Sequence, residues 1–476
     1  MAFPLSSSPS LEHDPPMKLQ STLLTSVILV ACAAQAYSTV QSESTDSETQ
    51  ESWTAWRGPD ASGVARAGNP PTQWSEEKNI RWKVEVPGLG HATPIVWKDR
   101  IYVMTAIETE EEGKPSAEGG GETDSGRGGG RRSGRGSSKA PTKVHEFAVL
   151  CLEREDGSEV WRSTVKKAVP HEGGHSTGSQ ASGSPLTDGE HIWAFFGSRG
   201  LYCLDMQGEV VWSKEFGAMR TARQFGEGAS PALAGDKLVV VWDHEGDSFI
   251  VALDKLSGKE LWREERDEGT TWATPRIIPV DGRTQVIVPG TVSSRAYDLE
   301  NGKLLWSCSG LTRNCIPSPL YADGVVYLMS GYRGSALQAI RLEGAKGDIT
   351  DGDELLWTHG RKTSYTPSGL LYDGLIYFLS GNTGSLSCVD AASGEVLYEG
   401  LRLDGIREVY ASPVAVDGRV FVTGRKGVTK VLAHGPKYEE LASNELDDGF
   451  DASAVIVGDE LYLRGTKHLY CIAEEK

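Results

Sequence analysis

Basic side chains, cysteines and long apolar runs are all scarce in this chain of 476 residues. Lysine and arginine together number 48 against 66 aspartates and glutamates, which gives a formal net charge of −18. So acidic a composition does not suit general binding to nucleic acid, and we expect no nucleic-acid partner. The 7 cysteines show no disulfide framework, and a chain of this length buries a large core without one.

The one strongly apolar stretch, residues 19–36, is short for a membrane span. Lys18 precedes it and small residues end it, a pattern that is typical of a secretory signal peptide. We interpret residues 1–36 as a leader, with the signal over about 17–36, and residues 37–52 as a disordered Ser/Thr/Glu-rich spacer.

Two processing sites remain open. Cleavage after Ala36 leaves a soluble protein that begins at Tyr37, whereas the lipobox-like Leu-Val-Ala-Cys run ending at Cys32 would leave that cysteine lipidated. Either route predicts a periplasmic or extracytoplasmic protein. Only the second adds contact with a membrane, through a lipid anchor in the outer membrane.

Glycine is abundant, at 56 residues, and the chain repeats itself. A Ser/Thr-Pro dipeptide recurs every ~44 residues, and each is followed by an apolar strand and a D-G or G-D turn. The dipeptides begin at Thr93, Ser184, Ser230, Thr274, Ser318, Thr366 and Ser412, and Ser453-Ala454 is a degenerate eighth.

Each repeat reads as short strands with tight turns between them, which is the signature of a propeller blade. We predict an all-β fold, an eight-bladed β-propeller of four-stranded antiparallel blades over residues 53–476. The eighth repeat has only three strands, so residues 79–84 should supply its fourth strand and close the ring. A Gly/Ser-rich segment, residues 108–143, is interpreted as a disordered insertion in the first blade.

Two side-chain positions recur in this register. Tryptophans occupy one position of the fourth strand, where they should pack between blades; blades six and seven carry Tyr398 and Leu441 there instead. Four cysteines share one position of the third strand and cannot pair: Cys151, Cys203, Cys388 and Cys471. Cys308 and Cys315 flank one loop between blades and are a candidate disulfide.

The repeat S-P…G-x-h-Y…L-Y-x-L-D-x-x-x-G-x-x-x-W resembles that of the PQQ-like (pyrroloquinoline-quinone-type) eight-bladed propellers. The opening W-x-x-W-R-G-P (53–59), SGYRG (330–334) and DDGFDAS (447–453) resemble a group of such propellers common in planctomycetes. The resemblance implies either a cofactor-free envelope protein like BamB or a quinoprotein dehydrogenase that holds PQQ and Ca²⁺. Two adjacent cysteines, as many of those dehydrogenases have, are not found here.

Blade topology sorts the loops onto two faces. Loops that lead into first strands and turns between second and third strands share one face, which we call the upper face; the other turns form the lower face. Arginines of the upper face could converge on the channel mouth and bind a carboxylate or phosphate. They are Arg199, Arg313, Arg333, Arg361, Arg407, Arg425 and Arg464.

Acidic residues of the same face are candidate Ca²⁺ ligands, although internal salt bridges are an alternative. They are Asp243, Glu245, Asp247 and Glu227, together with His244 in the same turn, and Asp447, Asp448 and Asp451 are nearby. By the quinoprotein resemblance, Trp272 could stack on a quinone and Asn314 and Glu227 could supply ligands. His171 and His175 fit H-E-x-x-H, but a proline and two glycines favour a loop over the helix that zinc binding needs.

The sequence thus favours a monomeric, non-catalytic binding or scaffold protein of the cell envelope that needs no cofactor. Its partner would be an envelope protein or an anionic small molecule. A PQQ- and Ca²⁺-dependent quinoprotein dehydrogenase is the first alternative, and a propeller that binds an anionic ligand or a carbohydrate is the second.

Overall fold

Apolar second and third strands and half-exposed outer strands build the blades. Strands such as β11 (Lys237–Trp242) are buried almost throughout because both faces of the sheet pack against neighbouring blades. Outer strands such as β13 (Glu260–Arg266) alternate between buried and exposed residues. The computed structural model describes residues 52–114 and 141–474. The predicted leader and all but Ser52 of the predicted spacer lie outside the described residues, and so does Cys32.

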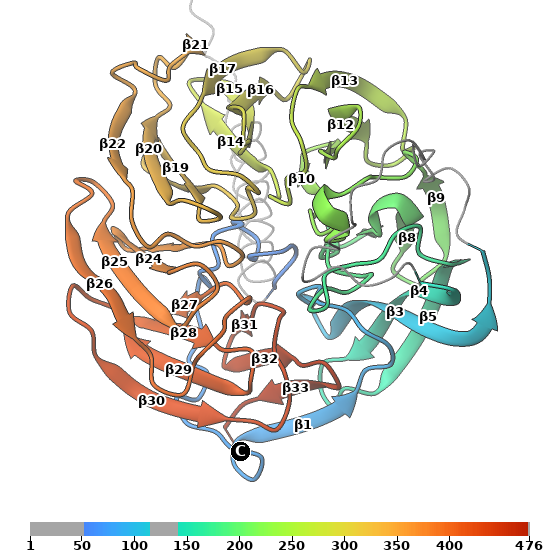
Figure 1. Cartoon of the computed structure of the whole chain (residues 1–476). Helices are drawn as coiled ribbons and strands as arrows, with labels where there is room; N and C mark the ends of the chain where they lie inside the picture. Colours follow the sequence, from blue (N-terminus) through green and yellow to red (C-terminus); the bar gives the residue numbers. More distant parts are fainter. Residues whose placement is uncertain (1–51, 115–140, 475–476) are drawn as a thin grey trace, which may run out of the picture. The chain divides into compact units, whose positions relative to one another are not determined.

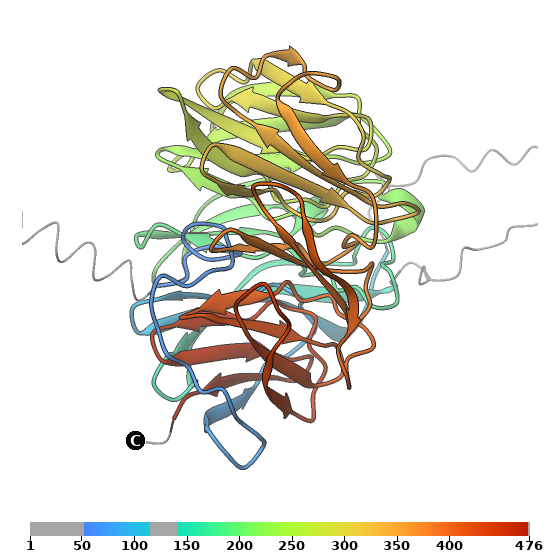
Figure 2. The same cartoon turned by 90° about the vertical axis from the view of Figure 1, so that its left-hand side faces the viewer.

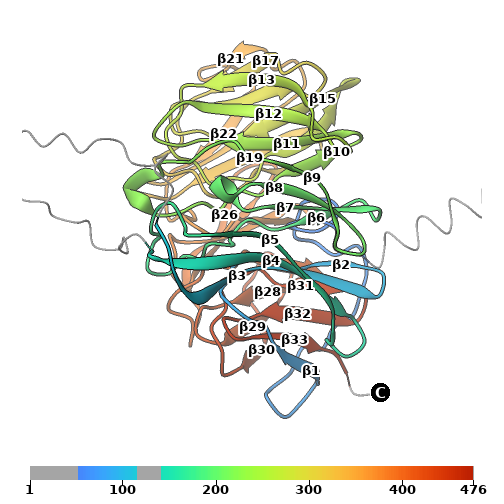
Figure 3. The same cartoon turned by 90° about the vertical axis from the view of Figure 1, so that its right-hand side faces the viewer.

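Eight sheets form a ring around a central channel. Figure 1 shows the ring end on, and Figures 2 and 3 show it from two sides. Blade one consists of β2 (Ile95–Trp97), β3 (Arg100–Glu112), β4 (Lys143–Glu153) and β5 (Glu159–Ala168), and blade two of β6 (Leu186–Thr187), β7 (His191–Phe195), β8 (Leu201–Asp205) and β9 (Val210–Lys214). Blade three consists of β10 (Ala232–Ala234), β11, β12 (Ser248–Asp254) and β13. Blade four consists of β14 (Arg276–Val280), β15 (Arg283–Val288), β16 (Ser294–Asp298) and β17 (Leu304–Cys308), beside which β21 (Gly347–Asp348) adds a short parallel strand.

The remaining blades follow the same order. Blade five consists of β18 (Leu320–Ala322), β19 (Val325–Ser330), β20 (Ala336–Arg341) and β22 (Leu355–His359), and blade six of β23 (Leu370–Tyr372), β24 (Leu375–Leu379), β25 (Ser385–Asp390) and β26 (Val396–Arg402). Blade seven consists of β27 (Val414–Val416), β28 (Arg419–Thr423), β29 (Val428–Ala433) and β30 (Glu440–Glu445). Blade eight consists of β31 (Val455–Val457), β32 (Glu460–Arg464), β33 (His468–Ile472) and β1 (Ile80–Glu85).

The eight-bladed, all-β prediction is confirmed, and so is closure of the last blade by an N-terminal strand. β1 pairs antiparallel with β33, with Trp82 opposite Cys471. The described residues contain only two single-turn 3₁₀ helices, η2 (Gly197–Arg199) and η3 (Ala222–Gln224). No helix in the described ranges is long and apolar enough to cross a membrane.

Hydroxyl side chains at the starts of the first strands join the blades into a closed ring. In each step the backbone N–H of one residue donates to the hydroxyl oxygen of its equivalent in the next blade, at 2.9–3.2 Å. We call this set the hydroxyl ring; its members are Thr93, Ser184, Ser230, Thr274, Ser318, Ser368, Ser412 and Ser453.

Three sequence assignments need correction. The sixth blade begins at Ser368, not at the predicted Thr366, because Ser368 receives the N–H of Ser318. In the seventh blade Ala442, not Leu441, lies opposite the third-strand position at Val431, because Leu441 is the extra residue of the β-bulge that recurs here in other blades. The predicted insertion is too wide at both ends, because β3 continues to Glu112 and β4 begins at Lys143. Residues 115–140 lie outside the described residues.

The fourth-strand tryptophans pack between blades as predicted. The indole N–H of Trp161, for example, donates to the carbonyl of Met206 in the next blade. The turn that presents this carbonyl contains Gly208, at φ +88°, where an added Cβ would lie only 2.7 Å from the Trp161 ring. Gly258 covers Trp212 in the same way. Five of the six fourth-strand tryptophans are covered in this way by a glycine of the following blade. The exception is Trp306, whose indole N–H donates to Gln285 Oε1 in its own blade.

The N-terminal segment, residues 52–65, lies inside the ring and is coloured blue near the centre of Figure 1. It forms bridges to two innermost strands, Trp53 with Val96 and Val64 with Ala415. Arg57 is buried and donates to the carbonyls of Pro413 and Gly369 in two different blades. Burial lowers the pKa of Arg57 to about 9. The segment thus connects blades across the channel.

Candidate functional site

A cavity of about 410 Å³ lies at the channel mouth and is lined mainly by aromatic rings and hydroxyl groups. Its aromatic lining is Trp56, His91, His175, Phe225, Trp272, Tyr332, Tyr365 and Tyr410. Its hydroxyl lining is Thr93, Thr177, Ser182, Ser230, Thr274, Thr366, Ser412 and Ser453. We call this the mouth cavity; its volume falls within the range of about 300–1,000 Å³ that small-molecule sites occupy.

The rings of the mouth cavity are held in place by neighbours. The Trp272 indole N–H donates to the Gly226 carbonyl at 2.7 Å. Tyr332 and Tyr365 stack with their ring centroids 4.9 Å apart and an interplanar angle of 27°. Preorganised rings lose little freedom when a ligand stacks on them.

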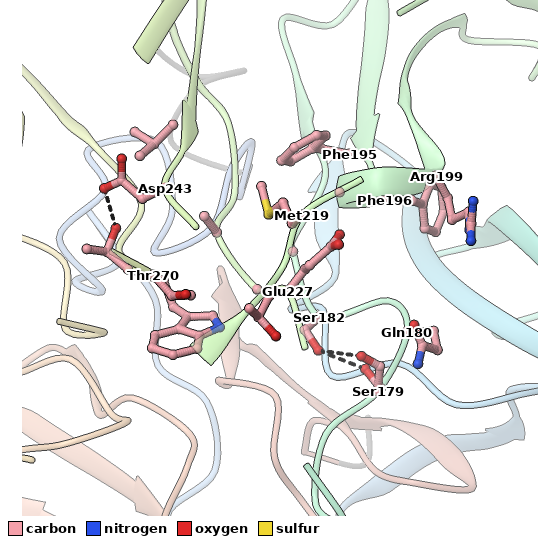
Figure 4. A pocket seen from close by; sticks show the side chains of 18 of the residues that line it. Ser179, Gln180, Ser182, Phe195, Phe196, Arg199, Met219, Glu227, Asp243 and Thr270 are labelled. Atoms are coloured by element: carbon pink, nitrogen blue, oxygen red, sulfur yellow. Dashed lines mark hydrogen bonds between the residues drawn. The ribbon is translucent and has the colours of Figure 1, made fainter. Parts of the chain in front are cut away.

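A second, much smaller cavity of about 30 Å³ adjoins the first, and Trp272 and Glu227 line both. Figure 4 shows Glu227 in its middle, with Asp243 on one side and Arg199 on the other. The Glu227 carboxylate accepts hydrogen bonds from the Ser198 backbone N–H and hydroxyl at 2.6 and 2.5 Å. Burial raises the pKa of Glu227 to about 7, against the opposing effect of these bonds.

None of the seven predicted arginines lines the mouth cavity. Arg199 and Arg464 are buried and donate to the carbonyls of Val169 and Gly90, at 2.6 and 2.8 Å. Burial lowers the pKa of Arg464 to about 9. The partners of both are backbone carbonyls inside the protein, and Arg199 also lines the small cavity.

The other five arginines lie on or near the rim. Arg425 forms a two-bond pair with Asp451, with Nη2 to Oδ2 at 3.0 Å, which joins a turn between second and third strands to a loop leading into a first strand. Arg361 reaches Glu399 at 3.3 Å. The remaining three are exposed: Arg313, Arg333 and Arg407. The cationic residue that does line the mouth cavity, Arg223, was not predicted.

The predicted calcium ligands are engaged by protein groups instead. Asp243 pairs with Arg266 through two bonds of 2.7 and 3.0 Å, and both side chains are fully buried. Glu245 accepts from the backbone and hydroxyl of Thr270. In the described residues the one His/Cys/Asp/Glu group close enough to share an ion is a different one, Asp188, Glu190 and His191.

Other members of that predicted set stabilise loops. The His244 Nδ1 accepts from the Arg220 N–H, and Nε2 lies 3.3 Å from the Asp247 carbonyl. Asp448 accepts from the backbone N–H groups of Gly449, Thr466 and His468. These contacts support the internal-network alternative at these positions.

The candidate disulfide is absent, and its two cysteines are separate free thiols. The Cys308 thiol donates to the Ser309 carbonyl, and the Cys315 thiol donates to the Thr312 carbonyl. Each sulfur thus points to its own local backbone. Burial raises the pKa of Cys308 to about 11 and that of Cys315 to about 12.

The H-E-x-x-H segment is a loop, as predicted. His171 Nε2 is bound to the Met219 carbonyl at 2.7 Å, while His175 Nδ1 contacts Thr177. His171 lines the small cavity, whereas His175 lines the mouth cavity.

The quinoprotein resemblance implied Trp272 as a stacking ring and Asn314 as a ligand, and only one of the two lines the mouth cavity. Trp272 lines it, whereas Asn314 lies behind the lining and donates to the Tyr365 hydroxyl at 3.3 Å. The W-x-x-W-R-G-P and SGYRG motifs could have pointed to Trp56 and Tyr332. Both motifs indicated a family, but nothing in either one indicated that its ring would face the channel.

Comparison with known proteins confirms the resemblance to PQQ-like propellers. The family model described as outer membrane protein assembly factor BamB matches residues 145–399 and 247–476. BamB from Moraxella catarrhalis is similar over 79% of this chain and 98% of its own, at 17% identity and a TM-score of 0.51. No curated protein matches the chain by sequence.

Two enzymes share the architecture. Quinohemoprotein alcohol dehydrogenase from Comamonas testosteroni is similar over 90% of this chain and 81% of its own, at 11% identity and a TM-score of 0.61. Quinohemoprotein alcohol dehydrogenase ADHIIG from Pseudomonas putida HK5 gives the same coverage, 12% identity and a TM-score of 0.56. At these identities the solved structures establish the fold alone.

Proposed function

The chain belongs to the family of the outer membrane protein assembly factor BamB, and from that premise we propose that it is a non-catalytic binding protein of the cell envelope. In this proposal it is exported by its leader, with Cys32 or Tyr37 as the mature N-terminus, and acts in the periplasm. The upper face of the ring is its recognition surface, and an envelope protein is its partner.

The observation that carries the proposal is the state of the acidic groups on that face. Asp451 is paired with Arg425, Asp243 with Arg266, and Glu227 with Ser198. A general base must be able to accept the proton it removes, and each of these carboxylates already accepts hydrogen bonds from a protein group. What the mouth cavity offers a ligand is mainly rings and hydroxyl groups.

PQQ with Ca²⁺ does not fit the mouth cavity. The quinone carries several carboxylates and needs cationic partners, and Ca²⁺ needs carboxylate or amide oxygens gathered at one point. The charged lining, histidines aside, is Arg223, Glu227 and Asp451, and the last two are already engaged. We therefore derive no oxidation chemistry for this chain, although Trp272 occupies a position suited to stacking.

A site-specific crosslinker tests the proposal. Placed at Arg407, an exposed upper-face position, it should give a discrete adduct with an envelope protein in intact cells. Placed at Asp323, an exposed turn of the lower face, it should give none and serves as the matched control. Equal labelling from both positions, or none from either, would overturn the upper face as the recognition surface.

A calorimetric titration tests the enzyme alternative separately. The purified mature protein, mixed with PQQ and Ca²⁺, should release no binding heat. Micromolar or tighter binding that disappears in Trp272→Ala would make the chain a quinoprotein and overturn the non-catalytic proposal.

A further inference from the structure

We propose that the mouth cavity is a binding site for a neutral carbohydrate chain. The inference deepens the binding function proposed above and rests on it. No residue of the seven-arginine set is involved, so the site differs from the anionic one that the sequence had suggested.

The lining has the two features that a sugar needs. A pyranose presents C–H groups on its faces, which stack on aromatic rings, and hydroxyl groups on its edge, which need hydrogen-bond partners. Trp272 and the Tyr332–Tyr365 pair supply preorganised ring surface. Trp56, from the segment that crosses the channel, adds a fourth ring.

Hydrogen-bonding capacity comes from the hydroxyl ring. Five of its members line the cavity: Thr93, Ser230, Thr274, Ser412 and Ser453. Each oxygen accepts a backbone N–H, which fixes its position, but among the described residues none of these five hydroxyls donates a hydrogen bond. Five O–H donors are thus held around one cavity, and a ligand rich in acceptor oxygens satisfies them.

The same lining argues against other ligand classes. Its one aliphatic side chain is that of Ile316, so an acyl chain would meet mostly polar groups. Arg223 is exposed, Asp451 has its charge balanced by Arg425, and the Glu227 carboxylate is bound by Ser198, so neither an anion nor a cation finds an unpartnered buried counter-charge there. A neutral, polar ligand with apolar faces matches best.

The test is calorimetric titration of the mature full-length propeller with two neutral trisaccharides, maltotriose and N,N′,N″-triacetylchitotriose. We expect at least one to bind with a dissociation constant below about 1 mM. Tyr332→Ala removes one ring at a turn, and Trp272→Phe shortens another without emptying its place. Each should weaken binding by about tenfold.

The matched control is Tyr438→Ala, which removes a tyrosine beside the outermost strand of blade seven, far from the channel. It should bind like the wild type. Circular dichroism of every variant separates lost binding from lost folding.

Three results would overturn the inference. One is the absence of binding heat with both sugars up to about 10 mM. Another is unchanged affinity in both ring variants. The third is tighter binding of tetramethylammonium than of either sugar, which would make the rings a cage for a cation. Because the crosslink from Arg407 reports a protein partner, an intact crosslink with a failed titration overturns the carbohydrate alone.

Discussion

At the scale of single residues, the Asp243–Arg266 pair shows how burial changes the value of an ion pair. Both side chains are fully buried, and Asp243 also accepts from the Thr271 hydroxyl. Asp243→Ala leaves a buried guanidinium without its counter-charge, so we expect a loss of about 3–5 kcal/mol in unfolding free energy. Urea unfolding measures it. The exposed pair Glu159–Arg162 is the control, and Glu159→Ala should cost less than about 1 kcal/mol.

Glu227 should make the stability of the fold depend on pH. Its pKa, raised by burial to about 7, lies above that of an unfolded glutamate at about 4.3. Between these two values the unfolded chain has lost a proton that the folded chain keeps, so stability falls as pH rises through the window. Relative to Glu227→Gln, the wild type should lose up to about 3 kcal/mol from pH 4.5 to 7.

Thermal unfolding at several pH values measures this difference. Glu439→Gln is the control, because it removes an exposed carboxylate. Its melting temperature should change with pH in the same way as that of the wild type. A wild type whose melting temperature rises over this window relative to Glu227→Gln would contradict the raised pKa.

At the scale of elements, two substitutions distinguish Ser368 from Thr366 as the residue of the sixth blade that belongs to the hydroxyl ring. Ser368→Ala removes the acceptor of the partly buried Ser318 N–H, so it should cost about 1–3 kcal/mol. Thr366→Ala, at the residue that the repeat pattern had chosen, should change stability by less than about 0.5 kcal/mol, because only its backbone N–H is bonded. Chemical denaturation of both variants decides which residue belongs to the ring.

The blades could be predicted from the sequence because a repeat states the same local pattern many times. Alternation of apolar residues and the D-G turns indicate strands and their ends without any long-range information. The same information misled at Thr366-Pro367, where a proline two residues early looked like the start of a blade. Neither a hydrogen bond between blades nor a β-bulge such as that at Ala442 is visible in one repeat.

The site was harder to predict, because it is formed by contacts between repeats that no single repeat shows. Topology placed the arginines and acids near the rim, but the direction of a side chain depends on what packs beside it. Arg464 turns inward to the Gly90 carbonyl, 374 residues away in the chain. Trp56 reaches the mouth cavity only because the N-terminal segment crosses the ring. Such contacts depend on the closed fold and have no local signature.

At the scale of the whole molecule, closure of the ring depends on the N-terminal residues. β1 covers the edge of β33, and Arg57 ties the segment before it to two other blades. A chain that begins at Val86 lacks both and exposes a strand edge, so it should lose its cooperative unfolding transition and self-associate. A chain that begins at Ser52 is the control and should melt like the full-length protein.

Differential scanning calorimetry measures the loss of the cooperative transition, and light scattering measures self-association. Adding the deleted segment back as a peptide tests whether both effects come from its absence and not from misfolding of the rest of the chain. A synthetic peptide of residues 52–85 should pair with β33, insert Arg57 and restore the transition to the shortened chain. A shortened chain that melts cooperatively without the peptide would show that seven complete blades and a three-stranded eighth suffice. The stability of the ring would then lie in the hydroxyl ring and the interblade tryptophans, not in its closure.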